Sequence, residues 1–465
     1  MSIIKSEPAA SAVSDLLMRL FERFFPGDSV RARVARGTFW SLVATVSIQM
    51  ASLASSILAA RILGQTGFGE LGMIRSTVLM FGVLAGSGLG LASTKYVAEF
   101  RDTYPARAGR LIGLLINVAF VAGGGATLLC FVLAPSLAGW AMNAPHLMGP
   151  LQFGCVMLLF NTLSGVQVGA LGGFEAFGVL ARIAVMDAIL NLALVPIGAW
   201  VFGVSGAVGG LALASVLGFP VKQLALKQLC QKTGVVMAHH GVSAELPTLW
   251  QFALPSVLVG VSIQPFEWFA RLLLSRQTNG FAELGIFTAA MSWGQLVMFI
   301  PQQILRPGIP ILSNLYTYSD AVRFIRTAIK FEWLIIGTGV VSAIPLMFLS
   351  PYIMAAYGVS FISGSRVLLI LLVAHILASA TSLTIVFTAS GKMWVQTLHY
   401  TLWGGALIGA FIIFRDFGSL GLGISYIFAY ASLLCIQLIC LYKSFGSLGN
   451  INRETKCEID NENAR

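Results

Sequence analysis

The chain has 465 residues, of which 57% are hydrophobic and only 10% are charged, and its net charge is +10 at pH 7. A soluble domain usually carries about 25% charged residues, so these charges are too few to cover a surface that faces water, and most of the surface must face lipid. The composition excludes an enzyme with a soluble catalytic domain. In a membrane protein, an excess of Lys and Arg is expected in the cytoplasmic loops, so we do not interpret the positive charge as a sign of nucleic-acid binding.

The first 37 residues do not have the pattern of a signal peptide. Apolar residues recur at helical spacing over residues 16–25, where Arg19, Glu22 and Arg23 interrupt them. We expect an amphipathic helix lying in the membrane interface, followed by a basic run.

Apolar stretches of about 20 residues, long enough to cross a bilayer as a helix, recur along the rest of the chain. We expect an all-α polytopic membrane protein with about twelve transmembrane helices. They are centred on residues 38–63, 70–92, 111–133, 150–172, 179–201, 204–224, 252–275, 284–305, 330–350, 365–388, 398–415 and 420–442.

A short repeat divides these spans into two halves. Gly67-Phe68-Gly69-Glu70-Leu71-Gly72 follows the first span, and Gly280-Phe281-Ala282-Glu283-Leu284-Gly285 follows the seventh. Six spans separate the copies, so both halves have the same orientation and should be related by a pseudo-twofold axis along the membrane normal. The expected domains are a cytoplasmic N-terminus (1–37), a six-helix lobe (38–224), a cytoplasmic linker (225–250), a second six-helix lobe (251–442) and a cytoplasmic tail (443–465).

The basic residues predict the orientation of the chain. With both termini in the cytoplasm, most of the 29 Lys and Arg residues fall on inside segments, Lys222 among them, as the positive-inside rule requires. The exceptions are Arg61, Arg75, Arg271, Arg276, Arg366 and Arg415. Of the residues near the interfaces, Arg61, Glu70, Arg276 and Glu283 are able to snorkel toward water.

The glycine patterns predict close packing. Gly67, Gly69 and Gly72 fit G-x-G-x-x-G, but a membrane span precedes them rather than a β-strand, so we interpret them as a tight turn between helices and not as a dinucleotide site. No GxxxxGK[ST] motif occurs, and the six cysteines form no CxxC pair, so we expect no nucleotide, cofactor, metal or disulfide framework. Glycine or alanine recurs every four residues on two spans, which indicates faces where helix backbones approach closely: Gly82, Gly86 and Gly90, then Gly206, Gly210, Ala214 and Gly218.

Two equivalent spans carry a polar stripe at helical spacing. The first stripe is Ser41, Thr45, Gln49, Ser52 and Ser56, and the second is Ser256, Gly260, Gln264, Glu267, Arg271 and Ser275. The first stripe is compatible with helix contacts or with a cavity lining. The second contains an acid and a base, which favours a cavity, and Pro265 should bend the helix just before Glu267.

Three other ionisable residues lie within predicted spans, namely Arg75, Asp187 and His375. A charge at the bilayer centre costs about 3 kcal/mol on insertion scales, so each should face protein or water. His375 is compatible with a helix contact or, less readily, with a proton relay.

Several motifs in residues 36–180 resemble those of a known family. They are Arg36-Gly37-Thr38-Phe39-Trp40, Ala60-Arg61-Ile62-Leu63-Gly64, Gly67-Phe68-Gly69, Gly88-Leu89-Gly90, Thr94-Lys95-Tyr96-Val97-Ala98-Glu99 and Ala170-Leu171-Gly172-Gly173-Phe174. This pattern resembles the polysaccharide-biosynthesis flippases, the translocases of O-antigen and exopolysaccharide repeat units within the multidrug/oligosaccharidyl-lipid/polysaccharide exporter superfamily.

The resemblance implies two six-helix lobes around a central cavity in the bacterial inner membrane. It implies a cargo of undecaprenyl-diphosphate-linked oligosaccharide, with a polymerase and glycosyltransferases in the same pathway. Because the sequence has no nucleotide motif to supply energy, we expect coupling to a proton or sodium ion gradient. Arg75 and Arg271 could contact the diphosphate. Gln49, Gln264, Trp268, Trp293 and Gln295 could contact sugars, and Glu267, Asp187 and His375 could couple ions.

Three alternatives remain open. A drug/cation antiporter of the same superfamily has the same plan, and Glu267 would suit a cationic drug, but Arg75 and Arg271 oppose it. A lipid II flippase typically has fourteen spans, which is more than the twelve expected for this chain. A membrane-embedded polymerase usually has a large outside loop with catalytic acids or bases, whereas the outside loops near 134–149 and 351–364 hold only His146. We therefore expect a transporter and no catalytic residue.

The partition of basic residues predicts that both termini are cytoplasmic and that residues 134–149 are outside. Topology reporters fused after residues 140 and 235 should therefore give opposite signals. The same signal from both fusions would contradict the twelve-span topology.

Overall fold

A computed structural model describes residues 30–86, 88–237, 245, 260–317, 321–389 and 393–462. The expected interfacial helix at residues 16–25 lies outside these residues, as do most of the expected linker and the first part of the seventh span. Every regular element in the described part is helical, which confirms the all-α fold. The α-helices are α2 (Val30–Leu84), α3 (Leu89–Phe100), α4 (Pro105–Ser136), α5 (Met148–Gly173), α6 (Phe177–Lys232), α8 (Gln264–Ser275), α9 (Gly280–Val297), α10 (Phe299–Thr317), α11 (Ala321–Tyr357), α12 (Ser365–Ala380), α13 (Thr384–Ala389), α14 (Met393–Phe414) and α15 (Gly418–Glu462).

Short turns of π-helix or 3-10 helix join several of these helices. They are η1 (Leu137–Ala141), η2 (Pro145–Leu147), η4 (Val359–Gly364), η5 (Thr381–Leu383) and η6 (Arg415–Phe417). Two helices continue past expected domain boundaries: α6 extends to Lys232, inside the expected linker, and α15 extends through most of the expected tail.

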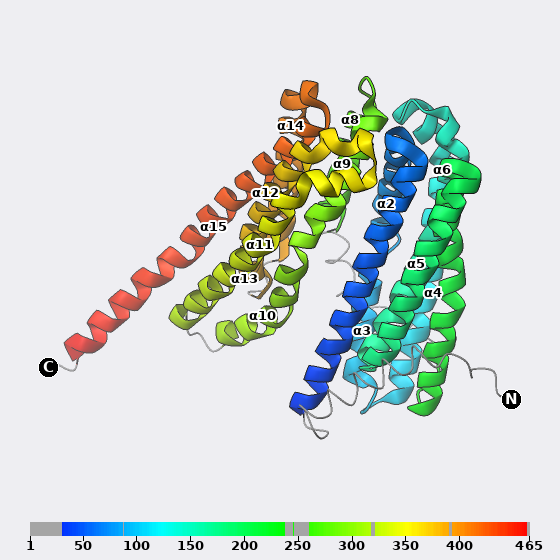
Figure 1. Cartoon of the computed structure of the whole chain (residues 1–465). Coiled ribbons are helices and arrows are strands. Elements are labelled where there is room, and N and C mark those ends of the chain that lie inside the picture. Colours follow the sequence, from blue (N-terminus) through cyan, green and yellow to red (C-terminus); the bar gives the residue numbers. More distant parts are fainter. Residues whose placement is uncertain are drawn as a thin grey trace.

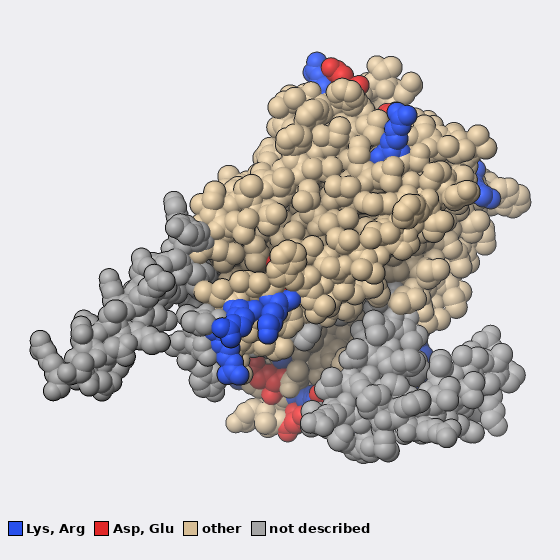
Figure 2. All heavy atoms as spheres, turned by 60° about the vertical axis from the view of Figure 1, so that its left-hand side comes forward, with Lys and Arg blue, Asp and Glu red and all other residues tan. Residues whose placement is uncertain are grey.

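The helices are long and apolar enough for a membrane. In the described residues, seven helical segments meet this condition, and the pair Gly280–Val297 and Phe299–Leu305, bent by 42°, would make eight. Figure 2 shows charged side chains near the two ends of one face, with almost only uncharged atoms between them. The chain is a membrane protein, while the number of twelve spans stays a prediction because several of these segments contain a break.

The longest helix, α6, is a hairpin of two antiparallel arms. Its 56 residues contain non-helical backbone at Phe202 and Gly203, at the boundary expected between the fifth and sixth spans. A Cβ at Gly198 would collide with the carbonyl oxygen of Gly206, and the reverse is also true. The small-residue face of the sixth span therefore packs against the fifth span, backbone to backbone.

The G-x-G-x-x-G segment is not the turn that we expected. The break in α2 lies earlier, at Gly64, which has φ 69° and ψ −177°, a backbone conformation that favours glycine. The three motif glycines that follow are helical. The reason for these glycines is the close approach of another helix, described below.

Two further predicted spans are broken. The second span stops at Leu84 and resumes at Leu89, across Gly86 with φ 114°. In the seventh span, Pro265 does not bend a continuous helix; α8 begins at Gln264, with the proline in its first turn. Proline is well suited to that position because its missing N–H would have no partner there. Glu267 therefore lies in the first turn of a new helix.

The helices form two lobes that meet at one end (Figure 1). Helices α2 to α6 form the first lobe and α8 to α15 the second, and α2 begins and α15 ends at the end where the lobes diverge. The buried apolar residues follow this shape. One large cluster includes residues of both lobes, such as Phe68 and Phe287. Two smaller clusters belong to one lobe each, around Leu111 in the first and around Phe324 in the second.

The lobes are joined where the two copies of the sequence repeat pack together. A Cβ at Gly69 of α2 would collide with the carbonyl oxygen of Phe281, and one at Gly285 of α9 would collide with the carbonyl oxygen of Gln65. At Gly72 a Cβ would lie 2.6 Å from Thr288 Oγ1. We call this contact, made by Gln65, Gly69, Gly72, Phe281, Gly285 and Thr288, the glycine seam.

Side chains reinforce the glycine seam. Arg61 Nε donates a hydrogen bond to the carbonyl oxygen of Ala356 at 2.6 Å, and Gln65 Nε2 donates to that of Ser360 at 2.7 Å. The ring of Phe68 packs against Tyr357, with ring centroids 6.1 Å apart. Arg61 therefore holds the two lobes together, and snorkelling does not describe its position.

A methyl group in the glycine seam should prevent its closure. Because the colliding atoms at Gly69 and Gly285 are backbone, they cannot turn aside, and overpacking of this kind typically costs about 1–3 kcal/mol. In a cysteine-free background with Gln65→Cys and Ser360→Cys, Gly69→Ala or Gly285→Ala should lower the yield of a short bifunctional crosslink by about tenfold.

The matched control for this experiment is Gly124→Ala on α4, because a Cβ there would meet no atom within 4 Å. This variant should crosslink like the parent protein. Full crosslinking of both seam variants would show that the contact between the repeats does not depend on glycine.

Candidate functional site

An ion pair on α8 forms the centre of the candidate site. Arg271 Nη2 lies 3.3 Å from Glu267 Oε2, one helical turn away, and the two side chains are only 14% and 16% exposed. The spacing of four residues places both on one face of the helix, in the Glu-then-Arg order that favours pairing. The first turn of α8 adds the partial positive charge of a helix N-terminus near Glu267.

The first lobe contributes a second cation to this site. Arg75 of α2 is exposed, and its guanidinium lies within electrostatic range of that of Arg271. Two residues further along α2, Thr77 accepts a hydrogen bond of 2.9 Å from Trp268 Nε1 of α8. The structure thus brings together Arg75, Glu267, Trp268 and Arg271 from both lobes, and two positive charges face one negative charge.

An aromatic group from α14 and α15 lies behind the ion pair. Trp403 packs against Tyr426 and Tyr430, with ring centroids 6.0 and 5.4 Å apart. The Tyr426 hydroxyl lies close enough to Glu267 and Arg271 to interact electrostatically. Trp403 Nε1 is buried and has no hydrogen-bond partner among the described residues. The buried Tyr426 hydroxyl faces Glu267 and Arg271, so the aromatic group brings a polar atom to the ion pair.

Sequence reasoning missed these aromatic residues. Tyr426 and Tyr430 lie one turn apart in the last predicted span, and Trp403 lies in the span before it. That spacing was a signal that they share a face. What the spacing could not show is that this face turns toward α8.

The other proposed sugar-binding residues are more scattered. Gln264, at the start of α8, and Gln49 of α2 are half-buried, and Gln295 of α9 is exposed. Trp293 Nε1 donates a 3.0 Å hydrogen bond to Tyr357 Oη, beside the glycine seam. Of the five residues proposed to contact sugars, only Trp268 forms a hydrogen bond that ties the two lobes together at the ion pair.

Asp187 lies in a separate ion pair within the first lobe. Its Oδ2 is 2.8 Å from Lys222 Nζ, across the two arms of α6, and Lys222 is only 8% exposed. A Cβ at Gly218 would lie within 3 Å of both side chains, so the glycine leaves room for the pair. Lys222 was assigned to a cytoplasmic segment from the sequence; in the structure it is buried, because Asp187 compensates its charge.

His375 has the geometry of a helix contact. The side chain is buried, and its Nδ1 lies 2.7 Å from the carbonyl oxygen of Leu371 in the same helix. The ring packs on Gly294 of α9, where a Cβ would lie 2.6 Å from it. In this conformation the ring fills the space that a small residue leaves between two helices.

Sequence reasoning missed the buried acid Glu332 of α11. This side chain is 9% exposed, and its Oε1 has no hydrogen-bond partner among the described residues. The only signal was a single acid at the edge of the predicted ninth span. At the end where the lobes meet, the acids of the sequence repeat contact other elements: Glu70 contacts His146 of η2 at 2.8 Å, and Glu283 accepts a hydrogen bond of 2.9 Å from the Ser419 backbone of α15.

Comparison with known proteins gives a consistent result. A family model described as polysaccharide biosynthesis protein matches residues 34–316. The lipid III flippase of Escherichia coli (strain K12) is 26% identical over 310 residues, which cover 64% of this chain and 71% of that protein. The EPS I polysaccharide export inner membrane protein EpsE of Ralstonia solanacearum is 22% identical over 424 residues, covering 89% of this chain and 94% of the relative.

Solved structures identify the fold. An inward-facing multidrug resistance MATE family transporter of the MOP superfamily superposes with a TM-score of 0.75 at 16% identity, covering 88% of this chain and 99% of that one. An outward-facing structure of such a transporter gives a TM-score of 0.66 at 17% identity, covering 92% and 98%. The chain therefore has a MATE-like transporter fold.

Proposed function

The chain belongs to the polysaccharide biosynthesis protein family, and we propose that it is a flippase that moves undecaprenyl-diphosphate-linked oligosaccharide repeat units across the bacterial inner membrane. Relatives with the names lipid III flippase and EPS I polysaccharide export inner membrane protein support this assignment. Both termini are proposed to lie in the cytoplasm. A polymerase and glycosyltransferases would act on the same lipid-linked glycan before and after translocation.

The observation that carries this proposal is the excess positive charge where the lobes meet. Arg75 and Arg271 lie near each other with Glu267 as the acid paired to Arg271. A guanidinium matches the geometry of a phosphate because its N–H groups donate two parallel hydrogen bonds. A diphosphate would therefore supply the negative charge that this site lacks. The polyprenyl chain could remain in the bilayer while the sugar crosses.

The shape of the lobes fits the first step of such a cycle. The glycine seam closes the end that is predicted to be periplasmic, and the lobes diverge toward the other end (Figure 1). A cargo that enters from the cytoplasmic leaflet requires lobes that are open toward the cytoplasm and closed toward the periplasm. Separation of the glycine seam, with closure of the opposite end, would complete alternating access.

A drug/cation antiporter is the second candidate, since the solved relatives include multidrug transporters. The charge at the site opposes it, because among the described residues a cationic drug would meet two guanidiniums and one carboxylate. A polymerase is a third candidate. Incubation of the purified protein with lipid-linked repeat units distinguishes it, because a polymerase makes longer glycans, whereas a flippase only moves them and performs no reaction.

Loss of either arginine should abolish transport. A charge-assisted hydrogen bond in a dehydrated site is worth about 1.5–3 kcal/mol, so Arg271→Ala, and separately Arg75→Ala, should reduce translocation of a lipid-linked repeat unit in proteoliposomes by at least about tenfold. Surface polysaccharide should disappear from cells, while the amount of membrane-inserted protein is unchanged.

Arg415→Ala is the control for the arginine variants, because Arg415 is 69% exposed and, in the described part of the chain, forms an ion pair with its neighbour Asp416 alone. It should transport normally. Normal export by Arg271→Ala or Arg75→Ala would assign that arginine a purely structural role.

Glu267 is proposed to couple transport to an ion gradient, because we expect no nucleotide site. Without cargo, Glu267 is paired with Arg271. A diphosphate that takes Arg271 would leave Glu267 beside a second anion and so favour its protonation. Cargo and proton would then promote each other's binding by reciprocity. Asp187 is the reserve candidate, although its pairing with Lys222 in this conformation ties it to a different partner.

Proton flux tests this coupling directly. Proteoliposomes with the wild-type protein should show proton movement that depends on the lipid-linked cargo, and Glu267→Gln should abolish it. Asp416→Asn is the matched control, because Asp416 is 89% exposed. Unchanged proton flux in Glu267→Gln would show that Glu267 is structural and would make Asp187 the candidate for coupling. Transport that depends on a sodium gradient but not on a proton gradient would identify sodium as the coupling ion.

A further inference from the structure

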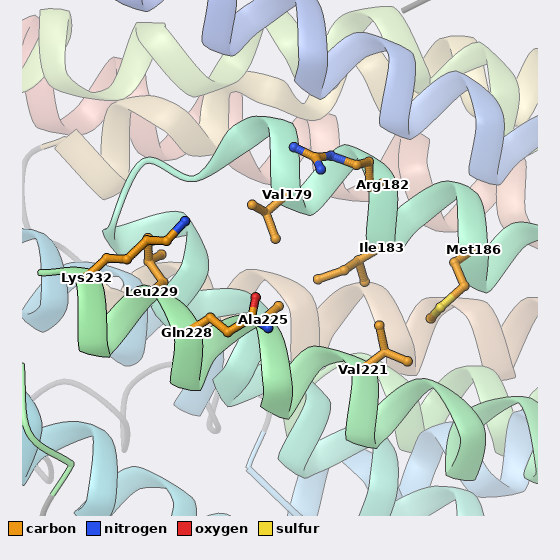
Figure 3. A pocket seen from close by; sticks show the side chains of 9 residues that line it. All are labelled: Val179, Arg182, Ile183, Met186, Val221, Ala225, Gln228, Leu229 and Lys232. Carbon is orange, nitrogen blue, oxygen red and sulfur yellow. The ribbon is translucent and has the colours of Figure 1, made fainter. Parts of the chain in front are cut away.

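A groove separate from the arginine site lies between the two arms of α6. It has a volume of about 350 Å³. Its lining residues (Figure 3) come from 179–186 and 221–232, near the two ends of α6 and far along the chain from the turn at Phe202 and Gly203. Its lining consists of Val179, Arg182, Ile183, Met186, Val221, Ala225, Gln228, Leu229 and Lys232.

The charges of this groove are of one sign. Arg182 and Lys232 are exposed, come from opposite arms, and extend toward one another over the groove in Figure 3. Gln228 adds an amide to the lining, and no acid is among the described lining residues. The nearest acid along the chain, Asp187, is neutralised by Lys222. The groove therefore offers two cations and an amide donor to an anion.

The rest of the groove is apolar and continues onto an apolar surface. Ile183 is buried, Val221 is 39% exposed and Leu229 is half-buried. Beside them, Leu224 is 59% exposed and Val185 is 37% exposed. On a membrane helix, such a surface faces acyl chains. A ligand that contacts both the cations and the apolar surface of the groove must combine an anionic head group with a hydrocarbon chain.

The position along the membrane identifies the source of such a molecule. The groove lies at the end where α2 begins and α15 ends (Figure 1), which is predicted to be cytoplasmic. Anionic phospholipids are concentrated in that leaflet, and basic pockets between transmembrane helices bind their head groups. The cations would lie at the depth of the phosphates, and the apolar floor at the depth of the chains.

We propose that this groove is a binding site for an anionic phospholipid, whose phosphate is held by Arg182 and Lys232 and whose acyl chain lies on Ile183, Val221 and Leu229. The bound lipid holds the free ends of the two arms together. Because the opposite ends are already joined at Gly198 and Gly206, it stabilises the hairpin at its only open end. This role does not depend on what the protein transports.

Native mass spectrometry of the full-length protein with defined lipids tests this site. Phosphatidylglycerol should remain bound in preference to phosphatidylcholine. The double variant Arg182→Gln, Lys232→Gln should bind phosphatidylglycerol about 30-fold more weakly, because each cation near an anionic head group strengthens binding by about fivefold. The control Lys227→Gln, Arg415→Gln removes the same charge, and neither residue lines the groove; its lipid binding should not change.

A photoactivatable phosphatidylglycerol with its reactive group in the acyl chain provides a test without any variant. It should label the segment around Met186 and Val221 in the wild-type protein. Equal loss of lipid in both double variants, or labelling elsewhere, would overturn the proposal. So would undecaprenyl diphosphate displacing the phospholipid from this segment at equal concentration, which would make the groove part of the cargo path.

Discussion

The close backbone contact between α2 and α9 is the constraint on which the rest of the structure depends. Gly69 and Gly285 each lie where a Cβ would overlap the carbonyl oxygen of the other lobe. Without side chains in between, dispersion contacts are made along the whole seam, and one apolar core extends through both lobes. The same contact sets α8 beside α2, so that Trp268 reaches Thr77 and Arg271 comes near Arg75. The candidate site is therefore a consequence of how the lobes join.

The ion pairs of the two lobes differ in their surroundings. In the first lobe Asp187 and Lys222 form a pair in which the acid and the base compensate one another. In the second lobe Glu267 pairs with Arg271, and Arg75 reaches the pair from the first lobe. A buried pair is neutral overall, whereas an extra cation in a membrane requires an anion or water. The proposed binding role of the second pair rests on this difference in charge.

The two proposed phosphate-binding sites lie in different parts of the fold. The arginine site lies where the lobes meet and has aromatic donors behind it. The α6 groove lies at the open end of the first lobe and has an apolar floor. The first is built from both lobes and must change when they move, whereas the second is built from one helical hairpin and can persist through the cycle. A cargo site and a lipid site differ in this way.

The sequence by itself determined the membrane class, the all-α fold, the repeat and the shared helix face of Glu267 and Arg271, because these depend on composition and on local helical spacing. It did not reveal that Gly69 and Gly72 serve a contact between lobes, or that α8 begins at Gln264. Nor did it reveal that Lys222 is buried against Asp187, or that Tyr426 lies beside Glu267. Each of these depends on which residue a distant helix brings near. Local spacing defines the face of a helix, but only tertiary packing decides what that face meets.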